Sequence, residues 1–69
     1  MGTNQMTIGG YQMEDLGYCI VVKEHEAGWS FSLQGDDANQ FRDDWDKAQE
    51  YDIPFRTFLS YYEYDTLFQ

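Results

Sequence analysis

The sequence has little of what fixes the class of many small proteins: one cysteine, one proline, four basic residues and no long hydrophobic run. A single cysteine allows no intrachain disulfide, which excludes the disulfide-stapled secreted class. No basic and apolar signal pattern opens the sequence, and no apolar run could span a bilayer, so we expect a cytoplasmic protein. At 69 residues we expect one domain, 1–69, near the lower size limit for folding alone, which leaves a homodimer open.

The scarcity of basic residues leaves thirteen acidic residues against four basic ones, a formal charge of −9. Proteins that bind DNA, RNA or anionic lipid neutralise phosphates with Lys and Arg, so this charge argues against nucleic acid or a membrane as a direct ligand. A field of one sign attracts a basic surface instead and speeds association with it. The partner that the charge predicts is therefore a basic protein.

Aromatic residues are abundant, at 19% of the chain. Two Trp, six Tyr and five Phe can bury much apolar area per residue, which excludes a disordered acidic tail. Cys19 lies in the most apolar run, and we expect it to be a core thiol without nucleophilic character.

Residues 17–35 predict a β-hairpin, because two β-rich runs flank a polar loop that ends at Gly28. In the second run Trp29, Phe31 and Leu33 alternate with polar residues and should face the core. The first run is apolar on both faces, with Tyr18, Ile20 and Val22 on one and Cys19 and Val21 on the other. Such a run is typical of a central strand.

Upstream, residues 5–13 are a candidate third antiparallel strand, in which Gly9 and Gly10 mark a bulge or bend.

Downstream of the hairpin, residues 37–51 predict an amphipathic helix. Asp37 is its expected N-cap, with Gln40 three residues later in the capping-box arrangement. The helix has one narrow apolar stripe, which should pack on the core face of the hairpin: Ala38, Phe41, Trp45 and Ala48.

Pro54 suits the first turn of a second helix, predicted over 54–67. Its apolar stripe consists of Phe55, Phe58, Leu59 and Tyr62. Tyr61, Tyr64 and Phe68 project from another side of this helix, so that either the tail changes conformation or these rings are exposed. The predicted fold class is thus α+β, with a two- or three-stranded antiparallel sheet packed against one amphipathic helix and a C-terminal helix.

The stretch "DDANQFRDDWDKAQEYD", residues 36–52, has seven carboxylates in seventeen positions. On a helical wheel Asp43, Asp46 and Glu50 lie opposite the apolar stripe. One interpretation is a solvated helix with two local ion pairs, Asp43–Lys47 and Arg42–Asp46. The other interpretation is a surface that a basic partner recognises. It is favoured because the stretch uses Asp where Glu, a better helix former, would serve solubility alone.

Other chemistry finds little support in the sequence. His25 lies between Glu24 and Glu26 in the expected hairpin loop, where the three side chains should not converge on a metal. No nucleophile, base or phosphate loop has its required partners, so we expect neither an enzyme nor a cofactor. The Tyr-rich end "YYEYD" allows two interpretations, an interface or closure of a very small core.

The acidic stretch 36–52 and the segment "YYEYD" resemble in type the small acidic inhibitors of bacteriophages and mobile elements, which include anti-CRISPR proteins and other DNA mimics. The resemblance implies a non-enzymatic inhibitor in the host bacterial cytoplasm, bound to the basic DNA channel of a CRISPR effector complex. The alternative is a small adaptor or subunit that docks a partner through its aromatic C-terminal segment. The expected partner-binding residues are Asp36, Asp37, Asp43, Asp44, Asp46, Glu50, Tyr61 and Tyr64.

Overall fold

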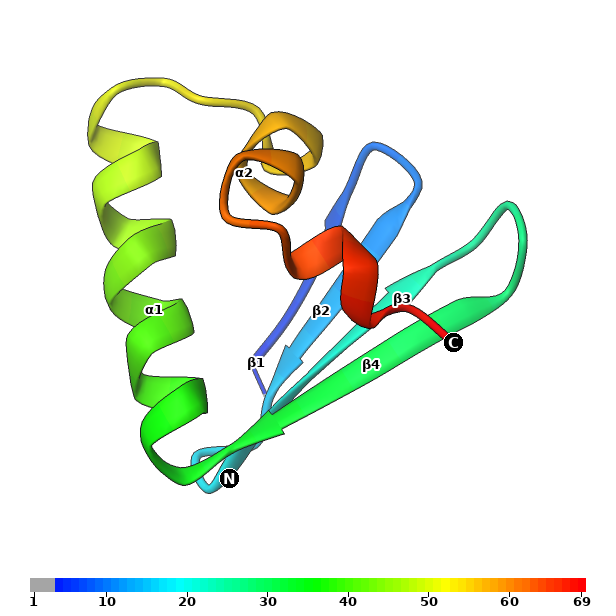
Figure 1. Ribbon diagram of the computed structural model, residues 1–69, viewed down its shortest axis with the longest axis horizontal. Coiled ribbons are helices and arrows are strands. Elements are labelled where there is room, and N and C mark those ends of the chain that lie inside the picture. The colour runs from blue at the N-terminus through cyan, green and yellow to red at the C-terminus, as the bar shows by residue number, and fades with distance from the viewer. Residues whose placement is uncertain (1–3) are drawn as a thin grey trace.

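The computed structural model describes residues 4–69, which form a four-stranded antiparallel sheet with helices on one face (Figure 1). The strands lie in the order β1-β2-β3-β4. The elements are β1 (Asn4–Ile8), β2 (Tyr11–Asp15), β3 (Cys19–Glu24), β4 (Trp29–Gln34), α1 (Gly35–Glu50), α2 (Phe55–Tyr61) and the 3₁₀ helix η1 (Tyr64–Leu67). The α+β class with an antiparallel sheet is confirmed, and the sheet has one strand more than the widest prediction.

The extra strand comes from the glycine pair. Gly9 and Gly10 have φ angles of +46° and +91°, and Ile8 lies opposite Tyr11. A two-residue turn with positive φ at both positions is the connection that suits the twist of a hairpin. The prediction of one strand with a bulge or bend at the glycines was therefore wrong, because the pair closes a hairpin between two strands, β1 and β2.

β3 is an interior strand, as its apolar run predicted, since it pairs with β2 on one side and β4 on the other. Ile20 and Val22 are fully buried under the helices, and Cys19 is buried as well. Tyr18 departs from the prediction because it precedes the strand, in the turn after β2, and is 75% exposed.

Trp29 also departs from its predicted place in the core. The register puts it on the same face as Phe31 and Leu33, yet it is 48% exposed. α1 starts beside the other end of β4 and diverges from the Trp29 end (Figure 1). Trp29 instead lines a hollow of about 260 Å³ together with Tyr11 and Phe68.

α1 begins at Gly35, two residues before the predicted start. Gly35 has a φ of +58°, which turns the chain directly from β4 into the helix. Gln34 is the N-cap residue, and no side chain caps the helix. The predicted capping box at Asp37 was therefore wrong, because no loop precedes the helix in which Asp37 could take the cap position.

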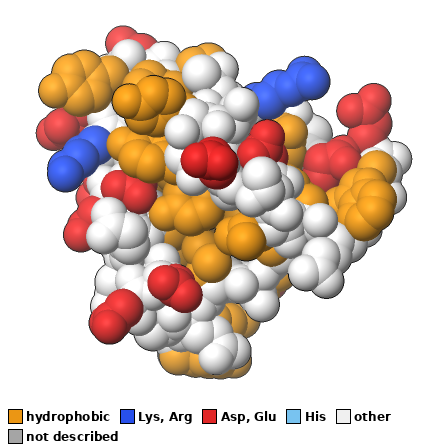
Figure 2. Space-filling view, viewed as in Figure 1, with side chains coloured by type: hydrophobic (Ala, Val, Ile, Leu, Met, Phe, Trp, Pro, Cys, Tyr) orange, Lys and Arg blue, Asp and Glu red, His pale blue; other side chains and the backbone are white. Residues whose placement is uncertain are grey.

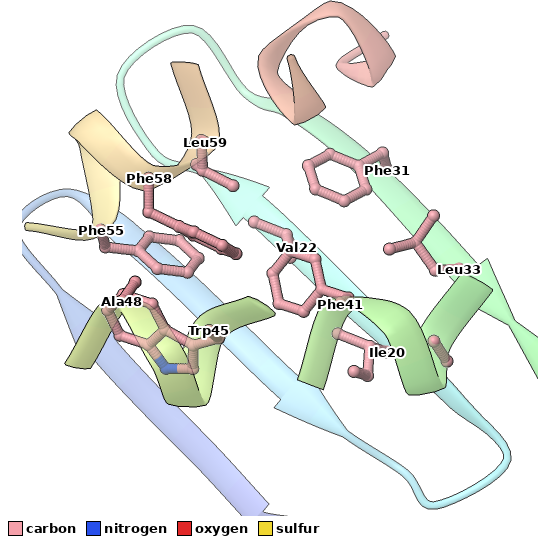
Figure 3. Close-up of a cluster of buried hydrophobic side chains, with 11 residues drawn as sticks. Ile20, Val22, Phe31, Leu33, Phe41, Trp45, Ala48, Phe55, Phe58 and Leu59 are labelled. Atoms are coloured by element: carbon pink, nitrogen blue, oxygen red, sulfur yellow. The ribbon is translucent and has the colours of Figure 1, made fainter. Parts of the chain in front are cut away.

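The core consists largely of aromatic rings from the two helices, packed on the inner face of β3 and β4 (Figure 3). Phe41 is fully buried, with its ring centroid 5.3 Å from that of Phe58 and 6.3 Å from that of Phe31. Trp45 packs edge-on against Phe55 at 4.9 Å. The apolar stripe of α1 is thus confirmed, and it joins the sheet to α2.

The C-terminal segment does not continue as one helix to residue 67. α2 ends at Tyr61, and Glu63 takes a φ of +62°, which redirects the chain into η1. This break lets Tyr64 and Phe68 fold back on Phe31, with centroids 6.4 and 4.8 Å from its ring. The tail thus changes conformation, as one of the two outcomes left open by the sequence required, while Tyr61 is exposed, as the other required.

Candidate functional site

Four carboxylates form one exposed side of α1, which we call the acidic face: Asp36, Asp43, Asp46 and Glu50. At about 100° per residue they lie within about 80° of one another and opposite Phe41. Asp36, Asp43 and Glu50 follow at seven-residue intervals, roughly 10 Å apart along the helix axis. Figure 2 shows acidic side chains along the side of the molecule that α1 forms, with one basic side chain among them.

No ion pair of the described chain involves the acidic face. Within residues 4–69 the ion pairs are Lys23 with Glu14, at 3.5 Å, and Arg42 with Asp15, at 2.8 Å. Lys47 has no carboxylate of the described chain within 4.0 Å of its ammonium group, so the expected pair with Asp43 is not formed. Neither of the two local ion pairs that the sequence predicted is thus formed in the described chain.

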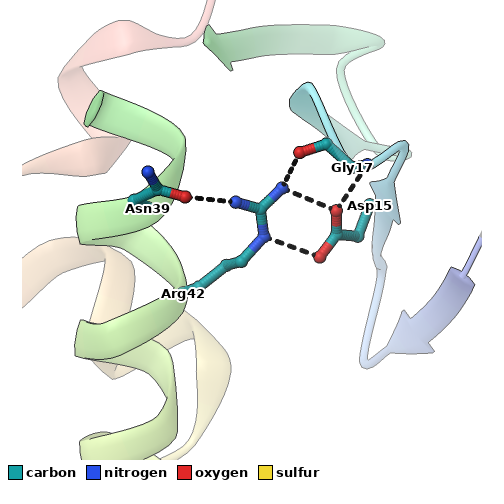
Figure 4. Close-up of polar contacts among 4 residues, drawn as sticks. All are labelled: Asp15, Gly17, Asn39 and Arg42. Atoms are coloured by element: carbon teal, nitrogen blue, oxygen red, sulfur yellow. Dashed lines mark hydrogen bonds and ion pairs between the residues drawn. The ribbon is translucent and has the colours of Figure 1, made fainter. Parts of the chain in front are cut away.

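Arg42 joins α1 to the turn after β2 instead of pairing with Asp46 (Figure 4). Its Nε and Nη2 donate to the two carboxylate oxygens of Asp15 at 2.9 and 2.8 Å. Nη2 also donates to the Gly17 carbonyl at 2.7 Å, and Nη1 to the Asn39 side chain at 2.8 Å. A bidentate pair of this kind outcompetes the weak pairing of neighbours on one helix face.

The electrostatics of this contact follow from its geometry. The hydrogen bonds from Arg42 lower the pKa of Asp15 against the opposing effect of burial, and a bond from the Gly17 N–H lowers it further. Hydrogen bonding to Asp15 in turn raises the pKa of Arg42. The pair is therefore fully ionised at neutral pH and holds α1 on the sheet.

Asp44 lies inside the fold, although the sequence placed it among the partner-binding acids. It is only 8% exposed and accepts hydrogen bonds from Gln40 Nε2, at 2.9 Å, and from the Tyr64 hydroxyl, at 3.1 Å. Burial, followed by the bond to Asp44 and by the charge of Asp37, raises the pKa of Tyr64 to about 12. Asp44 and Tyr64 thus fasten η1 to α1, and Asp37 belongs to this flank of the helix.

The aromatic residues of the C-terminal segment divide into two groups. Tyr64 and Phe68 are partly buried and pack on the core, whereas Tyr61 is 76% exposed. Tyr62, 40% exposed, contacts Tyr61 edge-on at 5.0 Å. Tyr51, also 76% exposed, was not among the predicted site residues. Its position directly after the helix, outside the apolar stripe, was the signal that could have marked it as a surface residue.

The loop between β3 and β4 contains the other polar side chains that the sequence analysis considered. His25 is exposed in the loop between β3 and β4, as expected, and Glu24 there accepts hydrogen bonds from the N–H groups of Glu26 and Ala27. Within residues 4–69 no three His, Cys, Asp or Glu side chains are grouped so that they could hold a metal ion. The charged surface of α1 and the exposed tyrosines are therefore the candidate interaction surfaces.

Two further findings bear on this surface. In the described part of the chain, no helix has both the length and the apolar character needed to cross a membrane. The chain has a formal charge of −9, and its described helices pack on its own sheet. Comparisons with family models, curated proteins and solved structures give no match to the chain.

Proposed function

We propose that the protein is a non-enzymatic inhibitor that binds a basic nucleic-acid-binding protein through the acidic face and thereby blocks its nucleic-acid channel. The observation that carries this proposal is four exposed carboxylates on one helix with no basic group of residues 4–69 within 4.0 Å. In its specific form, the inhibitor is of bacteriophage or mobile-element origin and the partner is a CRISPR effector complex.

The physical basis is competition for the same cations. A DNA channel gains much of its affinity when Lys and Arg contact phosphates and release counterions. Carboxylates spaced along a helix can contact the same side chains, and the net charge of −9 accelerates the encounter. Such binding should weaken as salt rises and should exclude nucleic acid.

The support of α1 favours a rigid charge array. Arg42 holds one flank of the helix to the sheet, Asp44 and Tyr64 hold the other flank to η1, and Phe41 anchors its inner side. The helix therefore needs little ordering on binding, which reduces the entropic cost of association. Asp44 and Tyr64 act here as supports, and the contacting acids are those of the acidic face.

The proposal is tested by binding of immobilised protein to a purified CRISPR effector complex, eluted with salt steps or with double-stranded DNA. Neutralising the acidic face by Asp43→Asn, Asp46→Asn and Glu50→Gln should weaken binding at least about tenfold and flatten its salt dependence. The matched control removes three exposed charges elsewhere, by Glu26→Gln, Glu63→Gln and Asp65→Asn. Equal loss in both variants would mean that only net charge matters, and no loss in the first would overturn the proposal.

A second candidate function is an adaptor that docks a protein partner through exposed tyrosines. Tyr61, at 76% exposure and in contact with Tyr62, is the observation that favours it, because Tyr is enriched at protein interfaces. Under this alternative, Tyr61→Ser would abolish partner binding, the charge-neutralised variant would bind normally, and the complex would resist salt.

A further inference from the structure

The two edges of the sheet differ in how their backbone groups are satisfied. At the β4 edge, the C-terminal Gln69 donates its N–H to the Ser30 carbonyl at 3.1 Å and accepts from the Ser30 N–H at 3.2 Å. α1 then begins directly after Gln34 and limits access to that end. At the β1 edge, no described segment lies beside the strand. β1 is thus the more accessible edge.

The register shows which groups of β1 point outward. Across the two-residue turn, Ile8 and Tyr11 form a hydrogen-bonded pair, and the pattern alternates along the strand. Met6 therefore bonds to β2, whereas the N–H and C=O groups of Gln5 and Thr7 point away from the sheet. Four backbone groups are aligned for a further strand.

β1 lacks the features with which proteins usually block an edge strand. Its sequence, NQMTI, contains no charged residue and no proline, and its pairing with β2 runs without a bulge. An edge of this kind is a template for pairing with another chain. On the helical side of the sheet, Met6 and Ile8 are only partly buried at the margin of the core.

The charged side chains next to this edge are paired within the fold. The two acids of the neighbouring strand are neutralised, Glu14 by Lys23 at 3.5 Å and Asp15 by Arg42 at 2.8 Å. The acidic face lies on α1, which contacts β3 and β4 and reaches β2 through the side chain of Arg42. β1 itself has no charged side chain, so β1 of a second copy would meet no like charge directly opposite its own residues.

We infer that β1 pairs antiparallel with β1 of a second copy, with Met6 on the two-fold axis. Gln5 then lies opposite Thr7 of the second copy, and the two symmetric pairs form four backbone hydrogen bonds, as an isologous interface requires. The dimer has one continuous eight-stranded sheet with both helical layers on the same face. This inference stands independently of the proposed function.

The assembly also has a consequence for the acidic faces. In an eight-stranded sheet with strands about 4.8 Å apart, the two α1 helices, each seated over β3 and β4, lie roughly 30 Å apart. Both acidic faces belong to the same layer, so that one dimer presents two separate charge arrays.

The test is sedimentation equilibrium of the full chain at several salt concentrations. The chain has a mass of 8.2 kDa, and the inference predicts a concentration-dependent shift toward twice that mass. Because the copies repel each other through their net charge, dimerisation should become stronger as salt rises. Binding through the acidic face would show the opposite salt dependence, so the two proposals can fail separately.

Two proline variants locate the interface. Thr7→Pro removes an N–H that points outward from β1 and leaves the bonds to β2 intact, and it should weaken dimerisation at least about tenfold. Ser32→Pro removes the equivalent outward N–H at the β4 edge and should leave dimerisation unchanged. Circular dichroism verifies that both variants remain folded.

Amide hydrogen exchange of the unmodified protein gives a readout that needs no variant. The Gln5 and Thr7 amides should be protected at high protein concentration and exchange rapidly on dilution. A monomer at all concentrations and salts, unprotected Gln5 and Thr7 amides in a dimer, or a dimer that survives Thr7→Pro would each overturn the inference.

Discussion

Asp15 of β2 and Asp43 of α1 are the same chemical group in opposite settings. Asp15 is held by two hydrogen bonds from one guanidinium and by a backbone N–H, whereas Asp43 is exposed and has no basic partner within 4.0 Å in the described chain. The acids are divided unevenly between the two regions, because six of the thirteen lie on α1 and three in the strands. In the sheet, Glu14 and Asp15 form ion pairs within the fold. On α1, most of the carboxylates are exposed to solvent.

Asp44 is the exception that clarifies this comparison. It lies on α1, yet its two bonded neighbours and its low exposure make it a structural residue. Location in an acidic stretch is therefore a poor guide to the role of a carboxylate. The partner of each oxygen decides whether removing its charge should affect stability or binding.

The largest expected effect comes from breaking the packing of α1 on the sheet. Phe41→Ala removes a fully buried ring that packs on both Phe31 and Phe58. We expect a loss of about 3 to 5 kcal/mol in the free energy of unfolding, enough to unfold much of a domain this small. Urea titration followed by circular dichroism measures this loss. Tyr61→Ala, at an exposed site, should cost less than about 0.5 kcal/mol, and a native-like midpoint for Phe41→Ala would contradict the described core.

A smaller effect separates a paired acid from an unpaired one. Asp15→Asn should cost about 1 to 2 kcal/mol at pH 7, while Asp43→Asn should change stability by less than about 0.5 kcal/mol. Because the folded-state pKa of Asp15 lies below its unfolded value, its contribution is present above the unfolded pKa and lost as pH falls through the folded pKa. The difference between the two variants should therefore shrink in strong acid, as urea titrations at several pH values would show. Equal costs at pH 7 would mean that the contact with Arg42 does not stabilise the fold.

The smallest effect concerns the bond between η1 and α1. Tyr64→Phe removes the hydroxyl that donates to Asp44 and should cost about 0.5 to 1.5 kcal/mol at neutral pH. Since the pKa of Tyr64 is raised from 10.0 to about 12, its protonated form is stabilised by folding. This contribution is present below pH 10 and lost as pH rises toward 12. Ultraviolet titration should show one tyrosine that ionises late, and its persistence in Tyr64→Phe would contradict the assignment.

The fold could be predicted where the hydrophobic period of the sequence determines directly which residues are buried. The alternation of β4 and the apolar stripe of α1 gave the hairpin and the helix because burial follows those periods directly. The glycine pair and the end of α2 could not be placed in the same way. Both depend on residues with positive φ, Gly10 at +91° and Glu63 at +62°, and whether a glycine pair bends a strand or reverses it is decided by pairing with β2.

The candidate site was predictable only in part, for a related reason. The wheel correctly separated Asp43, Asp46 and Glu50 from the core, because helical geometry alone determines which residues face outward. Burial of Asp44 and diversion of Arg42 required partners 20 and 27 residues away. No spacing in the sequence encodes such long-range pairs, so Asp44 and Tyr64 were grouped with the surface residues although they support the helix from within.

The most direct test of the acidic face as a nucleic-acid mimic is competition on a purified CRISPR effector complex, followed by the fluorescence anisotropy of bound double-stranded DNA. Native protein and the Glu26→Gln, Glu63→Gln, Asp65→Asn control should displace the DNA, with an apparent affinity that falls as salt rises. The Asp43→Asn, Asp46→Asn, Glu50→Gln variant should displace it at least about tenfold less well. Failure of the native protein to displace DNA, or equal displacement by both variants, would contradict the proposed function.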